Sequence, residues 1–173
     1  KISPQELAER LTMAGMEVVA LEKVGGDFVL EIEITSNRPD WLSVLGIARE
    51  VSAITGLKLK NLRFQEPKIK PKDFWPIKIS VFNKQDCPFY SARIISDLQV
   101  GLSPEWLKKR LQSLGCRSVN NIVDITNYLL FELGQPLHAF DLDKLSQKEI
   151  RVRRANADEK IITIDGQTRL LSP

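Results

Sequence analysis

The sequence holds few of the residues from which enzyme sites are usually built: its 173 residues include one histidine, His138, and two cysteines. Cys87 and Cys116 stand alone and form no C-x-x-C pair, so no zinc site is expected. We interpret both as packing residues of a protein in a reducing, cytoplasmic compartment. A Walker loop, a G-x-G-x-x-G turn and an H-E-x-x-H helix are all missing, so none of these common phosphate, dinucleotide or zinc motifs is present.

Long hydrophobic runs are missing as well, which argues against a membrane-spanning helix, and no signal peptide is visible. Instead, 43% hydrophobic and 27% charged residues are typical of a globular protein with one domain, or one domain and a smaller companion. The net charge of +3 permits contact with nucleic acid but does not by itself indicate it. Because the chain starts at Lys1 and its last hairpin stops abruptly at Pro173, we expect a segment of a longer protein.

The first sixty residues predict a small domain of helices and strands. Ser3 is a candidate N-cap, Pro4 suits the first helical position, and Glu6 completes a capping box. Residues 28–35 alternate between apolar and polar side chains, as a half-buried strand does. The expected elements are a helix from Ser3 to Gly15, strands over 18–24 and 28–35, and a helix capped by Asp40 or Ser43 that ends at Gly56.

Three prolines and several lysines over 61–76 predict a linker. We therefore expect a small N-terminal domain over 1–66, a linker over 67–76 and a second domain over 77–173. The second domain is expected to contain strands over 77–82, 90–100 and 150–155, a helix capped by Ser103, a helix that ends at Gly134, and a hairpin around Asp165–Gly166. The predicted fold class is α+β, with a partial mixed α/β second domain whose sheet is largely antiparallel.

His138 follows the last predicted helix on a short loop that Gly134 and Pro136 should make rigid. An imidazole there can position a water or a substrate carbonyl, and Asp141 can orient it if a helical turn forms. The alternative is structural, with the imidazole bonded to a carbonyl at the helix end. Spacing alone favours the structural interpretation, and no Ser–His–Asp or Cys–His pairing can be recognised from the sequence.

Two further polar positions allow both structural and functional interpretations. Asn127 interrupts an apolar helix, so its amide either supports the following loop or faces a polar ligand, and the sequence favours neither. Arg38 and Asp40 flank Pro39 in a polar turn where an arginine can bind phosphate or carboxylate. For this turn we favour the structural role, in which local hydrogen bonds tie the strand to the helix.

Basic residues gather near the helix over 104–115 and at the strand that follows residue 149. They are Lys108, Lys109, Arg110 and Arg117 in the first group, and Arg151, Arg153 and Arg154 in the second. Together they can line a track for nucleic-acid phosphates. For the lysines, a solvated helix face is the preferred interpretation.

Several stretches resemble the beta subunit of bacterial phenylalanyl-tRNA synthetase. "LTMAGMEV" and "EIEITSNRPDWLSVLGIAREVSAITG" are similar to parts of its small N-terminal domain. "RSVNNIVDITNYLLFELGQPLHAFDLDKL" is similar to the core of its editing domain, and "RRANADEKIITIDGQTRLL" to the sheet that follows. The pattern "VD-T-NY----E-GQP-HAFD" is the most specific part of the resemblance, which covers nearly the whole chain apart from the linker.

The resemblance implies a phenylalanine–tRNA ligase subunit whose editing-type domain hydrolyses tyrosine wrongly attached to phenylalanine tRNA. It gives His138 and Asn127 catalytic roles, in which they orient the substrate or a water rather than attack the ester. It places Thr126, Pro136 and Gln135 in substrate binding, and Arg117, Arg151, Arg153 and Arg154 in contact with tRNA. It implies an alpha subunit as partner, in a heterotetramer of two alpha and two beta subunits. That alpha subunit carries the ATP and magnesium chemistry, and no cofactor is expected in this segment.

Two departures from the family pattern limit what is expected of this chain alone. The OB-fold tRNA-binding insert of most bacterial members is absent where "LEKVGGDFVLEI" bridges directly. The remainder of the editing domain, which in the family supplies glycine-rich backbone and a glutamate, is also absent. We therefore expect half a pocket and no activity of the segment alone. The alternatives are a non-catalytic module that binds RNA or an amino acid, and a subunit scaffold in which His138 braces a helix end.

Overall fold

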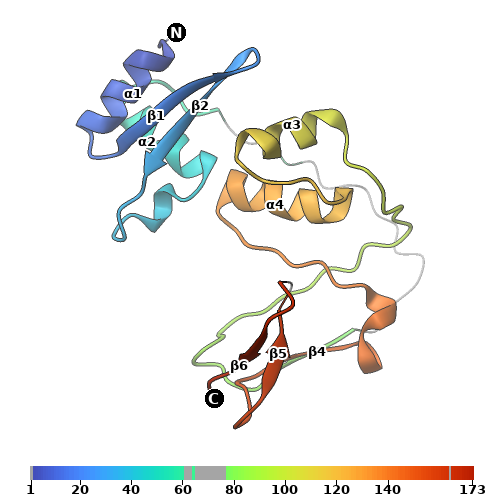
Figure 1. Ribbon diagram of the computed structural model, residues 1–173. Helices are drawn as coiled ribbons and strands as arrows, with labels where there is room; N and C mark the ends of the chain where they lie inside the picture. The colour runs from blue at the N-terminus through green and yellow to red at the C-terminus, as the bar shows by residue number, and fades with distance from the viewer. Residues whose placement is uncertain (1, 61–63, 65–76, 164) are drawn as a thin grey trace. The chain divides into compact units, whose positions relative to one another are not determined.

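The computed structural model describes residues 2–60, 64, 77–163 and 165–173, and it confirms the α+β class (Figure 1). The chain forms two compact units, residues 1–66 with 99–139 and residues 67–98 with 140–173. The first unit contains α1 (Pro4–Met13), β1 (Glu17–Val24), β2 (Asp27–Glu33), a 3-10 turn (Pro39–Trp41), α2 (Val44–Thr55), α3 (Glu105–Ser113) and α4 (Asn121–Leu133). The second contains β3 (Lys78–Val81), 3-10 turns (Leu142–Lys144 and Ser146–Lys148), β4 (Glu149–Val152), β5 (Lys160–Ile162) and β6 (Thr168–Leu170). The predicted linker over 67–76 lies outside the described residues.

Helix α1 begins at its predicted cap, Ser3, and ends at Met13, two residues before the predicted stop at Gly15. The Ser3 hydroxyl accepts a hydrogen bond from the Glu6 N–H at 3.1 Å, which satisfies one of the amides left open at a helix start. Gly15 has a φ of +95°, and the Met16 N–H then donates to the Leu11 carbonyl at 2.9 Å. A left-handed residue at this position lets the chain turn back under the helix, so Leu11 and Met16 are both buried.

The core of the first sixty residues lies between the β1–β2 hairpin and the two flanking helices. The strands pair antiparallel, with Glu17 opposite Glu33. The buried centre consists of Leu11, Met16 and Trp41, and the side chains packed against it are Leu7, Val18, Leu30, Ile32, Ile34, Ile47, Val51 and Ile54. Leu30, Ile32 and Ile34 face this core, as the alternation over 28–35 predicts, and each fully buried aliphatic side chain contributes about 2 kcal/mol.

The polar turn around Pro39 has the structural role that the sequence favoured. Arg38 donates from Nε and Nη2 to the two Asp40 oxygens at 3.0 and 2.8 Å, and from Nη2 to Glu50 at 3.0 Å. Its guanidinium carbon lies 3.5 Å from the centre of the Trp41 ring, and the Trp41 indole also donates to Glu50 at 3.2 Å. Arg38 therefore joins the turn to α2, and it lowers the pKa of Asp40 through its hydrogen bond.

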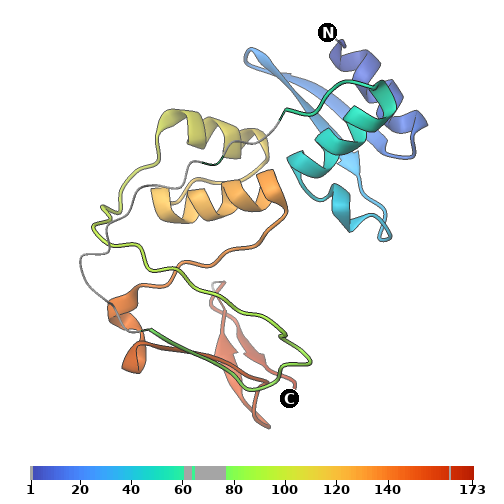
Figure 2. The same ribbon diagram turned by 180° about the vertical axis from the view of Figure 1, so that it is seen from behind.

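Helices α3 and α4 lie side by side in both views (Figures 1 and 2). Leu107 and Leu111 are buried on the inner face of α3. The rings of Trp106 and Tyr128 meet edge to face, with centroids 5.6 Å apart. Leu114 follows the last helical residue and caps the helix end, and it is 37% exposed.

Two predictions about this region are wrong. Ser103 does not cap α3: Pro104 occupies the cap position without a side-chain bond, and the Ser103 hydroxyl donates to Asp124 instead. Residues 90–100 form no strand, although their side chains alternate. A strand needs a neighbour for its backbone N–H and C=O groups, and no described segment pairs with this stretch. Ile95, Leu98 and Val100 are consequently more than half exposed.

The second unit contains one parallel and one antiparallel strand pair. β3 and β4 run parallel, with Lys78 opposite Glu149, and the Ser80 hydroxyl donates across the pair to Glu149 at 2.7 Å. β5 and β6 form the predicted hairpin. Gly166 has a φ of +76° in its turn, which a glycine adopts without steric cost.

Gly46 in α2 tests how tightly the Pro39 turn is packed. A Cβ atom at this position would lie 1.9 Å from the Asp40 carbonyl oxygen, which is backbone and cannot rotate away. We expect Gly46→Ala to lower the free energy of unfolding by about 3 kcal/mol or more in urea titrations. Gly26→Ala is the matched control, since a Cβ there meets nothing within 4 Å. Equal stability of the two variants would contradict this packing.

Candidate functional site

Helix α4 contains two of the predicted site residues, Thr126 and Asn127, and it leads into the segment that contains Gln135, Pro136 and His138. Its start is capped by Asn120, whose side-chain oxygen accepts from the N–H groups of Ile122 and Val123 at 3.0 Å each. Its end is set by Gly134, with φ +75° and ψ 14°, whose N–H donates to the Leu130 carbonyl at 2.8 Å. The chain then continues over 135–139 without regular structure.

A buried carboxylate fixes the first turn of α4. Asp124 is fully buried and accepts three hydrogen bonds, from the hydroxyls of Ser103 and Ser118 at 2.5 Å each and from the Val119 N–H at 2.9 Å. Burial alone would raise the pKa of Asp124, but these donors outweigh it and hold the pKa below its ordinary value. Asp124 therefore stays ionised, and it joins the segment before α3 to the segment before α4.

Asn121 fastens the same helix to the preceding chain. Its side-chain oxygen accepts from the Gly101 N–H at 3.1 Å, and its amide group donates to the Gln99 carbonyl at 2.9 Å. Its own N–H donates to the Gly101 carbonyl at 2.9 Å. Sequence reasoning missed both Asn121 and Asp124 as positioning residues. The available signal was a carboxylate and an amide on the apolar helix, where each must find partners.

The two predicted site residues within α4 differ in how they are bonded. The Thr126 hydroxyl donates to the Val123 carbonyl at 2.7 Å, so it is satisfied inside the helix. Asn127 is half-buried and makes no side-chain hydrogen bond within the described part of the chain. No fully buried side-chain nitrogen or oxygen in that part lacks a partner, so the Asn127 amide reaches solvent. Its side chain does not support the following loop by a hydrogen bond.

Gln135, Pro136 and His138 follow the helix end as exposed residues. The Gln135 amide donates to the Pro136 carbonyl at 3.2 Å, which stiffens this short stretch. The helical turn that Asp141 needed in order to orient His138 does not form over 138–141. Asp141 instead caps the turn that begins at Leu142, accepting from the Asp143 N–H at 3.1 Å.

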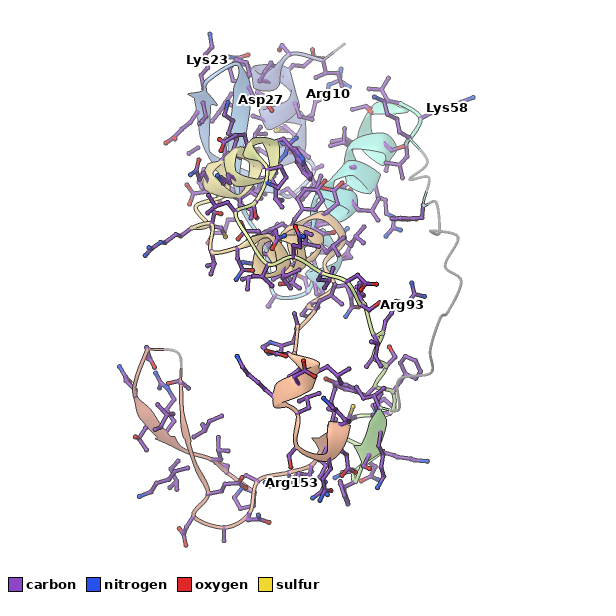
Figure 3. The ribbon with its side chains drawn as sticks, turned by 90° about the vertical axis from the view of Figure 1, so that its right-hand side faces the viewer. Arg10, Lys23, Asp27, Lys58, Arg93 and Arg153 are labelled. Carbon is purple, nitrogen blue, oxygen red and sulfur yellow. The ribbon has the colours of Figure 1, made fainter. Side chains whose placement is uncertain are left out.

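The three arginines in and directly after β4 are held by carboxylates. Arg151 donates to Glu149 at 2.7 Å, and Arg153, which is labelled in Figure 3, donates two bonds of 2.7 Å to Glu159. Arg154 donates to Asp86 at 2.5 and 2.9 Å. Ser80 and Arg151 lower the pKa of Glu149 to about 2. Arg153 and the Asn156 N–H do the same for Glu159, whose pKa is also about 2.

Arg117 differs from these arginines, since it is exposed and forms no ion pair with any described residue. It lies in the first unit, whereas Arg151, Arg153 and Arg154 lie in the second. The guanidinium groups of Arg151, Arg153 and Arg154 are oriented by their carboxylate partners, and their charge is largely offset. A phosphate bound there has to share them with carboxylates.

Other site types find no support among the residues that the structure describes. No three His, Cys, Asp or Glu side chains in this part gather as a metal site does. Cys87 and Cys116 are half-buried and unpaired by a disulfide. No helix in the described ranges is long and apolar enough to cross a membrane.

Comparisons with known proteins give a consistent family. Residues 86–173 match the model of the B3/4 domain. The chain is 52% identical over 148 residues to the phenylalanine–tRNA ligase beta subunit of Carboxydothermus hydrogenoformans, covering 84% of this chain and 18% of that protein. It is 44% identical over 179 residues to the same subunit of Geobacillus kaustophilus, covering 99% and 22%. For Rhodopirellula baltica the identity is 43% over 168 residues, covering 95% and 24%. The chain spans about a fifth of the length of these curated relatives.

We expect the stability of the first unit to depend on the ionised side chain of Asp124. Replacing it by alanine leaves two hydroxyls and an N–H without their acceptor, so we expect Asp124→Ala to cost about 3 kcal/mol of unfolding free energy at pH 7. Asp124→Asn keeps the shape and, after the hydroxyls rotate, most of the bonds, so it should cost less.

The pH dependence of stability follows from the lowered pKa of Asp124. Because the pKa of Asp124 is lowered in the folded state, its ionised side chain stabilises the fold at pH values above the unfolded pKa of about 3.9. This stabilisation is lost as the pH falls through the folded pKa. The melting temperature of the wild type should therefore drop more between pH 6 and pH 2 than that of Asp124→Asn. Parallel pH curves for the two proteins would show that Asp124 contributes nothing to acid sensitivity.

Proposed function

The chain belongs to the B3/4 domain family, and from that premise we propose that it contributes to tRNA binding and to hydrolytic editing of tyrosine mischarged on phenylalanine tRNA. The observation that carries the proposal is the arrangement around α4. The helix is fixed at its start by a buried carboxylate, presents the accessible Asn127 amide, and ends at a left-handed glycine before the exposed His138. The similarity to phenylalanine–tRNA ligase beta subunits supplies the substrate class.

The reaction is the hydrolysis of an aminoacyl ester by a positioned water. His138 and Asn127 orient the water or the ester carbonyl, since an imidazole can both donate and accept a hydrogen bond and an amide can do the same. Thr126, Gln135 and Pro136 shape the surface that receives the amino acid. Neither His138 nor Asn127 forms a covalent bond to the substrate in this scheme, so water is the nucleophile throughout.

Discrimination against tyrosine is the reason for a second site. Phenylalanine and tyrosine differ by one hydroxyl, and an apolar pocket that accepts the first rejects the second poorly. A site with a hydrogen-bonding group for the phenol favours tyrosine, because the phenylalanine ester leaves that group unpaired.

The proposal includes the assembly in which the segment works. We infer a heterotetramer of two alpha and two beta subunits, with ATP and magnesium used in the alpha subunit. The segment itself then needs no cofactor. Arg117, Arg151, Arg153 and Arg154 are the proposed contacts to tRNA phosphates.

His138 is tested in the two-subunit enzyme that contains this segment. We expect His138→Ala to slow hydrolysis of tyrosyl-tRNA specific for phenylalanine by about 100-fold, because orientation and proton transfer typically contribute that much. Aminoacylation with phenylalanine should be unchanged, and phenylalanyl-tRNA should be spared by both enzymes. Gln112→Ala, an exposed polar position on α3, is the control. If His138→Ala edits normally and only melts earlier, the imidazole braces the helix end and the site assignment is wrong.

Binding to tRNA is tested separately, through its salt dependence. We expect the triple variant of Arg151, Arg153 and Arg154 to glutamine to reduce the slope of log affinity against log salt by about 2, since each phosphate contact contributes about 0.7 to 0.9. Arg10→Gln removes another exposed, carboxylate-paired arginine and should leave the slope unchanged. An unchanged slope for the triple variant would place these arginines on a solvated face. Binding without hydrolysis would favour a non-catalytic RNA module, and the absence of both binding and hydrolysis would favour a scaffold.

A further inference from the structure

The glycine that ends α4 packs against the turn that begins α2. A Cβ atom on Gly134 would lie 3.4 Å from the Ser43 Cβ, 3.5 Å from the Leu42 carbonyl oxygen and 3.6 Å from the Ser43 hydroxyl. At these distances a Cβ atom on Gly134 would be in ordinary van der Waals contact with Leu42 and Ser43. The end of α4 therefore rests on Leu42–Ser43, which we call the seat.

The seat is itself rigid. The Ser43 hydroxyl accepts from the Gly46 N–H at 2.9 Å, the Ser43 carbonyl accepts from the Ile47 N–H at 3.0 Å, and the Ser43 N–H donates to the Trp41 carbonyl at 2.7 Å. On its other side, the Asp40 carbonyl fills the space where a Cβ of Gly46 would be. The seat cannot move without breaking the start of α2, so it acts as a fixed surface.

Two other helices end in the same backbone conformation without such a contact. Gly56 after α2 has a φ of +70° and Gly115 after α3 has a φ of +75°, yet a Cβ on either meets nothing within 4 Å. Left-handed geometry at a helix end therefore does not require a seat in this protein. Among these glycines, the contact with Leu42–Ser43 is made by Gly134, the one that precedes the segment containing His138.

We propose that the Leu42–Ser43 seat is a positioning surface for His138, acting through Gly134. The inference rests on the proposed function, in which His138 orients the ester or the water. His138 follows Gly134 by four residue steps, which span up to about 14 Å, so a rotation of about 5° at Gly134 moves the far end by about 1 Å. Errors of that size reduce rates by up to about 100-fold when reacting groups must be aligned. By fixing Gly134, the seat fixes the direction in which 135–139 leaves the helix.

Gly134→Asn is the first test, in the two-subunit enzyme. Asparagine tolerates the left-handed conformation, so the local helix end is preserved while the larger side chain meets the seat. We expect kcat for tyrosyl-tRNA hydrolysis to fall by about 10- to 100-fold, with KM and phenylalanine aminoacylation unchanged. Gly56→Asn and Gly115→Asn place the same residue in the same conformation in open space, and both should edit like the wild type.

The seat is altered from its own side by Ser43→Thr, with Ser3→Thr as the matched control. Both serines are helix N-caps, and threonine keeps the cap while adding one methyl group. His138 is the one histidine of the chain, so its ring protons give an isolated NMR signal in the 173-residue protein. We expect Ser43→Thr to shift that signal and lower kcat of the whole enzyme, and Ser3→Thr to do neither.

The two readouts separate this inference from the proposed function. If the His138 signal moves only in Ser43→Thr while the wild-type enzyme hydrolyses no tyrosyl ester, the positioning contact holds and the proposed function is wrong. If the signal is the same in Ser43→Thr and Ser3→Thr, and Gly134→Asn edits as fast as Gly56→Asn, the seat does not position His138. The second result overturns the inference whatever His138→Ala shows.

Discussion

The buried carboxylate of Asp124 is the interaction on which the placement of α4 depends. Its three donors come from the chain before α3 and from the chain before α4, and no solvent reaches it to replace them. In such a low-dielectric place a charged acceptor gains more from each donor than it would in water, and it loses more if one is missing. Helix α4 therefore has one well-defined position rather than a range of them. Asn127 follows Asp124 by three residues on nearly the same face of the helix. Fixing Asp124 therefore also fixes where Asn127 lies along the helix axis and in which direction it faces.

Charge pairing in the second unit limits what its arginines can do alone. Arg153 and Arg154 each grip a carboxylate with two bonds, which orients the guanidinium planes but offsets their charge. Exposed pairs of this kind are only weakly held, so a phosphate can take the place of a carboxylate. Replacing the carboxylate by a phosphate gives little net affinity per arginine. It also disfavours anions that accept only one of the two guanidinium hydrogen bonds. Arg117 has no such competitor within the described residues, and it is the simpler place for a single phosphate contact.

The sequence predicts helix ends correctly where a residue and its near neighbours in the chain determine them. Ser3, Ser43 and Gly134 begin or end helices as predicted, because capping involves groups three or four positions apart. Ser103 has the same local signal, but its hydroxyl is taken by a carboxylate 21 residues away, and no sequence window contains both. Residues 90–100 have the alternation of a strand, yet alternation shows only that a segment suits a sheet. Whether a ladder forms depends on a second strand, which is a property of the surrounding chain.

The candidate site illustrates the same division between residue type and placement. In the proposed function Asn127 and His138 carry the chemistry, but a half-buried amide and an exposed imidazole are not specific by themselves. Selection in that function between two esters that differ by one hydroxyl requires these groups to be held within a fraction of an ångström, which neither side chain can achieve by itself. That accuracy must come from the parts that hold the helix. Asp124 and Asn121 fix where α4 begins, and the contact of Gly134 with Ser43 fixes where it ends. A helix held at both ends by buried or tightly packed groups converts ordinary polar side chains into a defined arrangement. On this view the polar residues that touch no substrate are as necessary to the chemistry as those that do.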